Sequence, residues 1–306
     1  MNWNELRAFV SVARNASFSR AAEELHITQP AVTKRVQALE GSLSATLFDR
    51  VGKRVHLTDA GSLLLPRAEG LLREMSDTQR LLRNLKREVT GVLSLATSHH
   101  VGLHRLAPVL RAFSQRYPEV RLDIRFEDSE AAHELVREAE SELAVVTLDP
   151  LGNPELAYEH LWHDPLSFVV AAGHSLAGAE QLSLAELARH PVIMPGLGTY
   201  TGRIVAEVFA TAGVPLTPAM STNYLETIGM LVGTGLGWSV LPASVMSADL
   251  VSISTDAPPL HRALGLVTHP KRTLSNAAQA FTAVALEHRD PDSTNTPARD
   301  SALDDA

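Results

Sequence analysis

Apolar residues recur at helical spacing in three short segments near the start of the chain, and polar turns separate these segments. The predicted inward positions are Leu6, Phe9, Val10 and Ala13 in the first segment, Phe18, Ala21, Ala22 and Leu25 in the second, and Val32, Val36 and Leu39 in the third. Ser17 and Thr28 precede the second and third segments and are expected to cap these helices. Pro30 fits an early helical position, where no backbone N–H is needed.

A short basic hairpin is predicted directly after the third helix. Residues 47–58 form two short strand-like stretches around Gly52. Arg50, Lys53 and Arg54 lie near the tip of this turn. A charged hairpin tip is often merely solvated, but beside a pair of short helices it is typical of a wing that contacts the DNA phosphate backbone.

One long helical pattern begins at Thr58 or Asp59 and runs to about residue 90. Its inward positions alternate in steps of four and three residues, the a/d spacing of a coiled coil. These positions are Leu64, Ala68, Leu71, Met75, Thr78, Leu82 and Leu85. We expect this seam to pair with a second copy of the chain. Packing against the chain's own C-terminal domain is the alternative.

The chain from residue 91 to about residue 289 alternates strand-like apolar runs with amphipathic helices, a pattern typical of a parallel α/β sheet. Strands are expected at residues 91–97, 120–126, 143–148 and 166–171. Residues 290–306 are polar and rich in Pro, Ser, Thr and Asp, so we expect a disordered tail.

The charge distribution separates the two ends of this 306-residue chain, whose formal net charge is -8. Residues 1–89 hold 14 Lys and Arg against 10 Asp and Glu, whereas the remainder holds 13 against 25. A mildly basic head can approach phosphates, while an acidic body is repelled by DNA. The chain has no cysteine, which excludes disulfides, thiolate catalysis and redox sensing by a cysteine pair. No apolar run is long enough to span a bilayer and no signal peptide is recognisable, so a cytoplasmic protein is expected.

The outward face of the third predicted helix carries the candidate DNA-reading groups. Gln29, Thr33 and Lys34 face solvent when the apolar positions face the core, and Arg35 lies at the margin. Gln can pair with adenine, and Lys or Arg with guanine or phosphate, when such a helix enters the major groove. A helical subdomain with a merely solvated polar face is the alternative, and the basic hairpin beside it favours DNA binding.

Residues 15–40, which include Ser17-Phe18-Ser19-Arg20-Ala21-Ala22 and Thr28-Gln29-Pro30, closely resemble the helix-turn-helix of LysR-type transcriptional regulators. Leu47-Phe48-Asp49-Arg50 and Leu57-Thr58-Asp59-Ala60-Gly61 resemble the family's wing and the start of its linker helix. In the rest of the chain the resemblance rests on layout, length and the phrase Gly235-Leu-Gly-Trp-Ser-Val-Leu-Pro242.

The resemblance implies an α/β protein with an all-α, winged N-terminal head and a two-lobed effector domain similar to periplasmic binding proteins. The expected parts are a winged helix-turn-helix (1–58), a linker and dimerisation helix (59–90), an effector-binding domain (91–289) and a tail (290–306). Lobe 1 is expected at about 91–164 and 269–289, and lobe 2 at about 165–268.

The resemblance also implies a homodimer or homotetramer that binds an interrupted palindrome of double-stranded DNA at a promoter, with RNA polymerase and a small-molecule effector as further partners. Carried onto matching positions, it implies that the DNA contacts are made by Gln29, Thr33, Lys34, Arg35, Arg50, Lys53 and Arg54. The expected response to the effector is activation of transcription.

Ligands of open α/β sheets bind beyond the carboxyl ends of the strands, where helix N-termini offer free N–H groups. This rule predicts a cleft lined by Thr97, Ser98, His99, His100, Thr147, Gly198, Thr199, Tyr200, Thr201, Thr222 and Asn223. Because this set holds hydroxyls and imidazoles without a fixed cation, we expect a small organic acid held by hydroxyls and helix N-termini. Ser98 and Thr201 as plain helix caps, and Tyr200 as a surface aromatic, are the alternatives.

Other function classes find less support in the sequence. Residues 196–202 have the wrong glycine spacing for a dinucleotide loop, and no Walker motif or Gly-x-Ser-x-Gly elbow occurs, so neither an enzyme nor a bound cofactor is expected. A metal-responsive regulator using His99, His100 and His104 is an alternative, although no nearby Cys or carboxylate supports that set in the sequence. A solute-binding protein that does not bind DNA is the other alternative.

Overall fold

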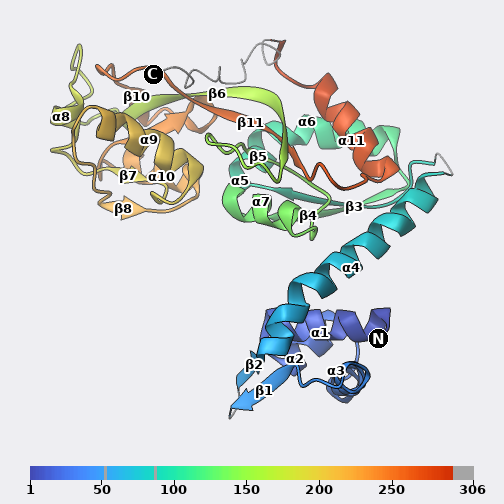
Figure 1. Ribbon diagram of the computed structural model, residues 1–306. Coiled ribbons are helices and arrows are strands. Elements are labelled where there is room, and N and C mark those ends of the chain that lie inside the picture. The colour runs from blue at the N-terminus through green and yellow to red at the C-terminus, as the bar shows by residue number, and fades with distance from the viewer. Residues whose placement is uncertain (52–53, 86–87, 292–306) are drawn as a thin grey trace, which may run out of the picture. The chain divides into compact units, whose positions relative to one another are not determined.

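The computed structural model describes residues 1–51, 54–85 and 88–291, without the side chains at positions 50, 51, 54 and 83. The chain divides into two compact units, Met1–Lys86 and Arg87–Ala306, which are described separately (Figure 1). The predictions for Lys53 and for the tail beyond residue 291 lie outside the described residues.

The first unit is a three-helix head with a two-stranded wing and one long helix. Its elements are α1 (Trp3–Asn15), α2 (Phe18–Glu24), α3 (Gln29–Leu43), β1 (Phe48–Val51), β2 (Arg54–Leu57) and α4 (Asp59–Asn84). The apolar positions predicted from spacing form one cluster, in which Phe9 and Leu39 are completely buried and Ala13 and Leu25 are partly buried. The hairpin pairs antiparallel, with Phe48 opposite Leu57.

The helix starts in this unit are set by short polar side chains, with one exception. The Ser17 hydroxyl accepts a hydrogen bond from the Arg20 N–H (3.3 Å), as predicted. Thr28 occupies the predicted N-cap position before α3. Its side chain makes no capping hydrogen bond to the described residues, so the predicted bond is not observed. At α4, Thr58 accepts from the Gly61 N–H (3.0 Å). A Cβ on Gly61 would lie 2.2 Å from the Leu47 carbonyl oxygen, so this position accepts no side chain.

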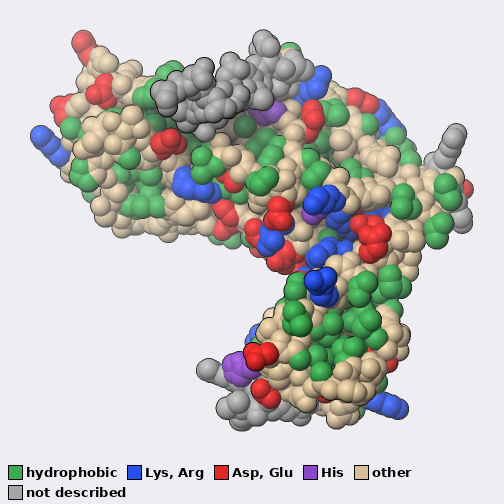
Figure 2. All heavy atoms as spheres, in the orientation of Figure 1, with side chains coloured by type: hydrophobic (Ala, Val, Ile, Leu, Met, Phe, Trp, Pro, Cys, Tyr) green, Lys and Arg blue, Asp and Glu red, His purple; other side chains and the backbone are tan. Residues whose placement is uncertain are grey.

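The predicted seam of α4 divides into two parts. Ala68 is buried in the core of the head and Leu64 packs against it, so the first part of the seam contacts its own unit rather than a partner. Leu71, Met75 and Leu82 are exposed. Figure 2 shows hydrophobic side chains gathered over α4 on this face of the unit.

The long helix is shorter than predicted. It ends at Asn84 rather than near residue 90. The described residues that follow have no regular structure, and Val89 packs against the core of the second unit. Residues 88–90 belong to no helix, so the helical pattern does not continue up to the first strand.

The second unit consists of two lobes. Its first elements are β3 (Gly91–Thr97), α5 (His99–Val101), a π-helical turn η1 (Gly102–Leu106), α6 (Ala107–Arg116), β4 (Val120–Phe126), α7 (Ser129–Arg137), β5 (Leu143–Thr147) and β6 (Ala157–Ala171). Next come α8 (Leu184–Leu187), β7 (Ile193–Met194), α9 (Tyr200–Thr211), β8 (Met220–Ser221), α10 (Leu225–Gly233), β9 (Ser239–Pro242) and a 3-10 turn η2 (Ala243–Val245). The last are β10 (Leu250–Ser252), β11 (Leu260–Thr268) and α11 (Asn276–Glu287).

The main sheet is mixed, not parallel as expected. Its path runs β10-β6-β11-β5-β3-β4, and β9 also pairs with β6. The β3 strand pairs in parallel with β4 and β5, whereas β11 is antiparallel to both β5 and β6. The antiparallel strands arise because β6 and β11 carry the chain out of the first lobe and back to it.

Each lobe buries its own apolar layers. In lobe 1, α6 and α11 cover one face of the sheet around Leu95, Phe113 and Phe281, and α7 covers the other face. In lobe 2, Phe209 stacks on Trp238, with ring centroids 5.6 Å apart. A further cluster in lobe 2 packs α10 against β7 and β9.

The two long strands β6 and β11 run from one lobe to the other (Figure 1). The β6 strand pairs with β11 over Ala157–Leu166 and with β9 over Leu166–Val169. Within β11, Leu264 and Leu266 already pack in the core of lobe 1 and pair with β5. The return crossing therefore lies inside β11, earlier than the boundary at residue 268 that we expected from the sequence.

Candidate functional site

The outward face of α3 carries polar groups as the sequence analysis predicted. Gln29 and Lys34 are exposed, and Thr33 and Arg35 are half-buried. The Gln29 amide donates a hydrogen bond to the Thr33 hydroxyl (2.9 Å), which orients Gln29 along the helix surface. Of the wing residues, Arg50 and Arg54 belong to β1 and β2, but their side chains lie outside the described part of the chain.

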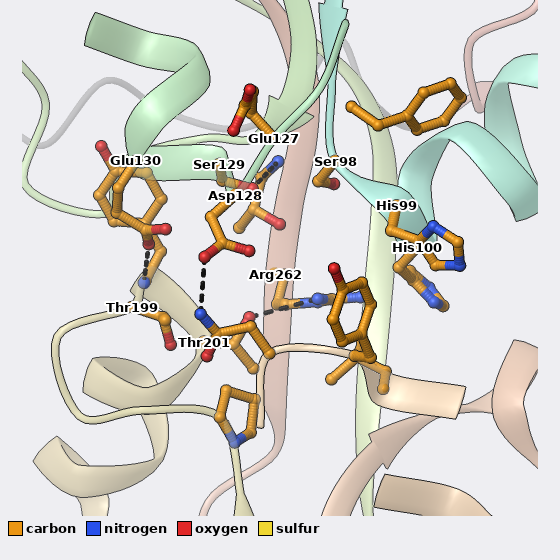
Figure 3. Close-up of a pocket in the computed structure, with 17 residues that line it drawn as sticks. Ser98, His99, His100, Glu127, Asp128, Ser129, Glu130, Thr199, Thr201 and Arg262 are labelled. Carbon is orange, nitrogen blue, oxygen red and sulfur yellow. Dashed lines mark hydrogen bonds between the residues drawn. The ribbon is translucent and has the colours of Figure 1, made fainter. Parts of the chain in front are cut away.

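A cavity of about 220 Å³ lies between the two lobes of the second unit. Ser98 reaches it from the residue after β3, His100 from α5, Ser129 and Glu130 from the start of α7, and Thr201 from α9 (Figure 3). The full lining comprises Ser98, His99, His100, Phe126, Glu127, Asp128, Ser129, Glu130, Thr147, Pro195, Thr199, Tyr200, Thr201, Asn223, Tyr224, Leu225 and Arg262.

The structure brings most of the sequence-predicted cleft residues into this cavity. They are Ser98, His99, His100, Thr147, Thr199, Tyr200, Thr201 and Asn223. Thr97, Gly198 and Thr222 do not line it. The carboxyl-end rule therefore predicts most of the loops that line this cavity.

The cavity contains a fixed cation, contrary to the expectation from the sequence. Arg262 on β11 is 3% exposed and lines the cavity. Its Nε donates to Asp164 Oδ2 (3.1 Å), its Nη2 also donates to Asp164, and its Nη1 donates to the Thr201 hydroxyl (3.2 Å). Thr201 is thus a partner of this arginine rather than a helix cap.

Carboxylates line the opposite wall of the cavity and join the lobes. The Asn223 side-chain amide donates to Asp128 Oδ2 (2.7 Å), and the Tyr200 N–H at the start of α9 donates to Glu130. Asp128 lies in the loop after β4 and Glu130 lies in α7, so both hydrogen bonds connect lobe 1 to lobe 2. Figure 3 shows Asp128 and Glu130 on the same side of the cavity. A carboxylate of the protein therefore already occupies the N-terminus of α9.

The helix-start residues around the cavity have different roles. Thr199 caps α9, because its hydroxyl accepts from the Gly202 N–H (3.0 Å) and donates to the Gly196 carbonyl (2.7 Å). Ser98 precedes α5, and its hydroxyl makes no hydrogen bond within the described residues. Tyr200 is buried, and burial, followed by the charges of Asp149 and Glu130, raises the pKa of its hydroxyl. It is therefore not a surface aromatic.

Two histidines and a carboxylate meet at the edge of the cavity. His100 Nδ1 lies 3.1 Å from Glu226 Oε1, and His104 Nε2 lies 2.9 Å from the same oxygen. Burial, and secondly the charge of Arg262, lower the pKa of His100 to about 4. Burial favours the protonated form of Glu226, but hydrogen bonds from its own backbone N–H and from His100 outweigh burial and lower its pKa.

Comparison with known proteins decides the family. Residues 3–62 match the model of the bacterial regulatory helix-turn-helix protein of the lysR family, and residues 86–290 match that of the LysR substrate binding domain. The chain is also 31% identical over 283 residues to a RuBisCO operon transcriptional regulator of Allochromatium vinosum, covering 90% of this chain and 93% of that one. The protein belongs to the LysR family of transcriptional regulators. As in that family, its helix-turn-helix unit binds DNA and its two-lobed unit binds an effector.

Two further similarities accompany this LysR-type regulator. It is 25% identical over 290 residues to the transcriptional activator CmpR of a Synechocystis strain, covering 93% of this chain and 95% of that one. A full-length OxyR variant from Pseudomonas aeruginosa shares its fold, with a TM-score of 0.70 and 22% identity over 93% of this chain and 94% of the other. In the described part of this regulator, no helix combines the length and apolar character needed to cross a membrane.

The sequence analysis missed several residues of the cavity in this regulator. Asp128 and Ser129 follow β4, so the rule that located Ser98 after β3 would have located them as well. Arg262 lies within a strand, and its signal was a single cation in the apolar run Leu260–Thr268. Such a cation must find a buried partner, but the sequence does not say that the partner is Asp164.

Proposed function

We propose that this LysR-type regulator acts in the cytoplasm as an activator whose effector is a small organic acid that also carries hydroxyl or ammonium groups. The observation that carries the proposal is the lining of the interlobe cavity, where buried Arg262 faces a wall of carboxylates. Arg262 attracts an acid group, and Asp128 and Glu130 accept hydrogen bonds from donors on the ligand.

The size of the cavity limits the effector. About 220 Å³ is below the roughly 300–1,000 Å³ of sites for drug-sized molecules, so a compact metabolite fits best. The free hydroxyl of Ser98 provides a further contact for the acid group. Because Asp128 and Glu130 bond across the cleft, an effector that competes for them changes the orientation of the lobes.

On the DNA side, Gln29 and Thr33 face base edges in the major groove, and Lys34 and Arg35 contact bases or phosphates. Arg50, Lys53 and Arg54 are assigned to the phosphate backbone beside the wing. Paired α4 helices join the heads of a homodimer or homotetramer, so the operator is an interrupted palindrome at a promoter. The similarity to CmpR, an activator by name, supports recruitment or contact of RNA polymerase as the output. A solute-binding protein would have no use for the helix-turn-helix.

Two measurements test the proposal. Selection of bound duplexes from a random DNA pool should return an interrupted palindrome, and recovery of unrelated sequences would remove the operator assignment. Thermal unfolding of the full-length protein should then be followed against hydroxy acids, amino acids and their uncharged amides. An effector at a hundredfold excess over its Kd adds about 2.7 kcal/mol.

A matched variant connects a hit to the cavity. Ser98→Ala should weaken binding of the acid and leave operator binding intact. An amide that binds as tightly as its acid would contradict the role of Arg262, and a hit that Ser98→Ala does not weaken would move the effector to another site.

A further inference from the structure

Three potential metal ligands from both lobes converge beside the effector cavity. His100 lies in α5 and His104 lies one π-helical turn later in η1, both in lobe 1. Glu226 lies in the first turn of α10 in lobe 2. Within the part of the chain that the structure describes, these three form the one group of His, Cys, Asp or Glu side chains whose ligand atoms all lie within 4.8 Å of one another.

The separations of the Glu226 oxygen from the two imidazole nitrogens fit a tetrahedral ion. Zinc binds His nitrogen and carboxylate oxygen at about 2.0–2.2 Å, so two ligand atoms at the tetrahedral angle are about 3.3 Å apart. The observed separations to Glu226 Oε1 are 3.1 Å from His100 and 2.9 Å from His104. The two imidazole rings lie 4.7 Å apart, tilted by 41°. The third separation, between the two imidazole nitrogens, is at most 4.8 Å, so a bound ion requires the two histidines to approach each other more closely if that separation is near this limit.

The surroundings of the triad provide two further features of a metal site. Glu226 Oε2 is a buried atom that has no hydrogen-bond partner among the described residues. The far nitrogen of His100, Nε2, lies 3.3 Å from the Ser244 hydroxyl. A metal-binding imidazole usually donates its other N–H to such a group, which fixes the tautomer. The nearby positive charge of Arg262 opposes a bound cation, and Asp164 offsets that charge only in part.

The site is also open to an entering ion. The side chains of His104 and Glu226 are 25% and 31% exposed, whereas that of His100 is 6% exposed. His99, which the sequence alternative included, does not join the group, because its ring contacts Phe126 and Tyr224 instead. The group therefore differs from the sequence alternative in that Glu226 takes the place of His99.

We propose that His100, His104 and Glu226 bind a divalent transition metal of the zinc type and that this ion ties the two lobes together. Nitrogen and carboxylate ligands suit zinc and its neighbours better than magnesium or calcium. Three protein ligands leave one tetrahedral position for water. Because the ligands come from both lobes, the ion favours the lobe orientation that brings Glu226 to the histidines.

Cobalt is a suitable probe, because tetrahedral Co²⁺ absorbs strongly in visible light. Tag-free, chelator-treated full-length protein is titrated with Co²⁺ and then with Zn²⁺, without DNA or organic effector. One Co²⁺ per chain with a tetrahedral spectrum, displaced by Zn²⁺, is expected. Zn²⁺ should also raise the Tm of the wild type.

Three variants and one control locate the ion. His104→Ala and the isosteric Glu226→Gln should weaken Co²⁺ binding at least about tenfold, and Ser244→Ala should weaken it about 10–100-fold. The control is His163→Ala/His261→Ala, which removes another close histidine pair, with rings 4.5 Å apart, and should bind as the wild type does. Circular dichroism verifies that each variant is folded.

A wild type that takes up no Co²⁺ or Zn²⁺ overturns the metal site, as does equal binding by Glu226→Gln or loss of binding in the control. These readouts require neither operator nor organic effector. Their failure is therefore distinct from failure of the proposed regulatory function.

Discussion

Arg262 and Asp164 lie directly opposite each other on β11 and β6, at the place where these strands pass between the lobes. Both side chains are buried, and Arg262 Nε donates to Asp164 Oδ2 across 3.1 Å. Arg105 adds a longer contact to the other carboxylate oxygen (3.4 Å). The pair forms a charged link at the junction of the lobes, and its arginine also lines the cavity between them.

Arg262→Met should destabilise the second unit strongly, because it leaves Asp164 buried with only Arg105 nearby. Removing one partner of a buried ion pair lowers the free energy of unfolding by about 3–5 kcal/mol. Because Arg105 still contacts Asp164, we expect a loss near the lower end of this range. The double variant Arg262→Met/Asp164→Leu should recover most of the loss. Denaturant unfolding followed by fluorescence of Trp162 and Trp238 measures both.

The control for this prediction is Arg116→Met, which removes an exposed pair with Glu287 and should change stability little. A double variant as unstable as Arg262→Met alone would show that the pair is needed for packing rather than for charge compensation.

Gln29→Ala should reduce specific operator binding by about 1–3 kcal/mol if Gln29 contacts a base edge. The amide is exposed on α3 and is already oriented by Thr33, so its loss removes a contact without disturbing the core. Fluorescence anisotropy with the selected operator and with scrambled DNA measures the specificity ratio. Gln115→Ala, which removes an exposed amide on α6 of the second unit, is the matched control. An unchanged ratio for Gln29→Ala would remove Gln29 from the base contacts.

Leu71→Gln/Leu82→Gln should dissociate the oligomer. These side chains are 46% and 63% exposed, so burying the exposed part of each stabilises association by roughly half of the about 1.5–3 kcal/mol that full burial of a leucine provides. Gln preserves helix propensity, so α4 itself should remain formed. Sedimentation velocity reports the mass, and Glu74→Gln on the same helix is the control. If the double variant keeps the wild-type mass, α4 does not pair through this seam.

The stability of the second unit should fall as the pH decreases below about 6.5, the ordinary pKa of His. His133 is 3% exposed, and burial lowers its pKa in the folded protein. The unfolded chain then binds a proton that the folded chain does not, so the free energy of unfolding decreases with falling pH. His100 contributes in the same direction.

His133→Asn isolates the contribution of His133. Asn retains a donor for the Ser129 carbonyl, which His133 Nδ1 reaches at 2.6 Å, but does not titrate. Its plot of unfolding free energy against pH should be less steep below pH 6.5 than that of the wild type. The control is His26→Asn in the first unit, and parallel wild-type and His133→Asn plots would contradict the assignment.

The helix-turn-helix could be predicted almost completely because its elements are specified by neighbouring residues. Helical spacing locates Phe9, Val32 and Leu39 in one core, and Ser17 caps its helix by a bond three residues away. Thr28 shows the limit of that reasoning. A threonine at this position predicts a side-chain hydrogen bond to the first turn of α3, but that bond is not observed. The sequence analysis did not predict that the first half of the α4 seam packs against its own head. Periodicity identifies the apolar face of a helix, but it does not identify the surface against which that face packs.

The effector cavity could be predicted only in part. Loops at the carboxyl ends of strands follow from strand order, which is why Ser98, Thr147 and Thr199 lie where they were expected. Contacts between distant segments do not follow. His100 and Glu226 are 126 positions apart, and nothing near either residue indicates the other.

The sequence by itself determined the elements and the family, because helical periodicity, capping and the helix-turn-helix motif act over a few residues. Only the tertiary structure decided the charge of the effector cavity and the triad at its edge. Both depend on the pairing of β6 with β11 and on the contact of α5 and η1 with α10. Those long-range contacts form when apolar faces are buried together, and burial then compels Arg262 and Asp164 to pair with each other.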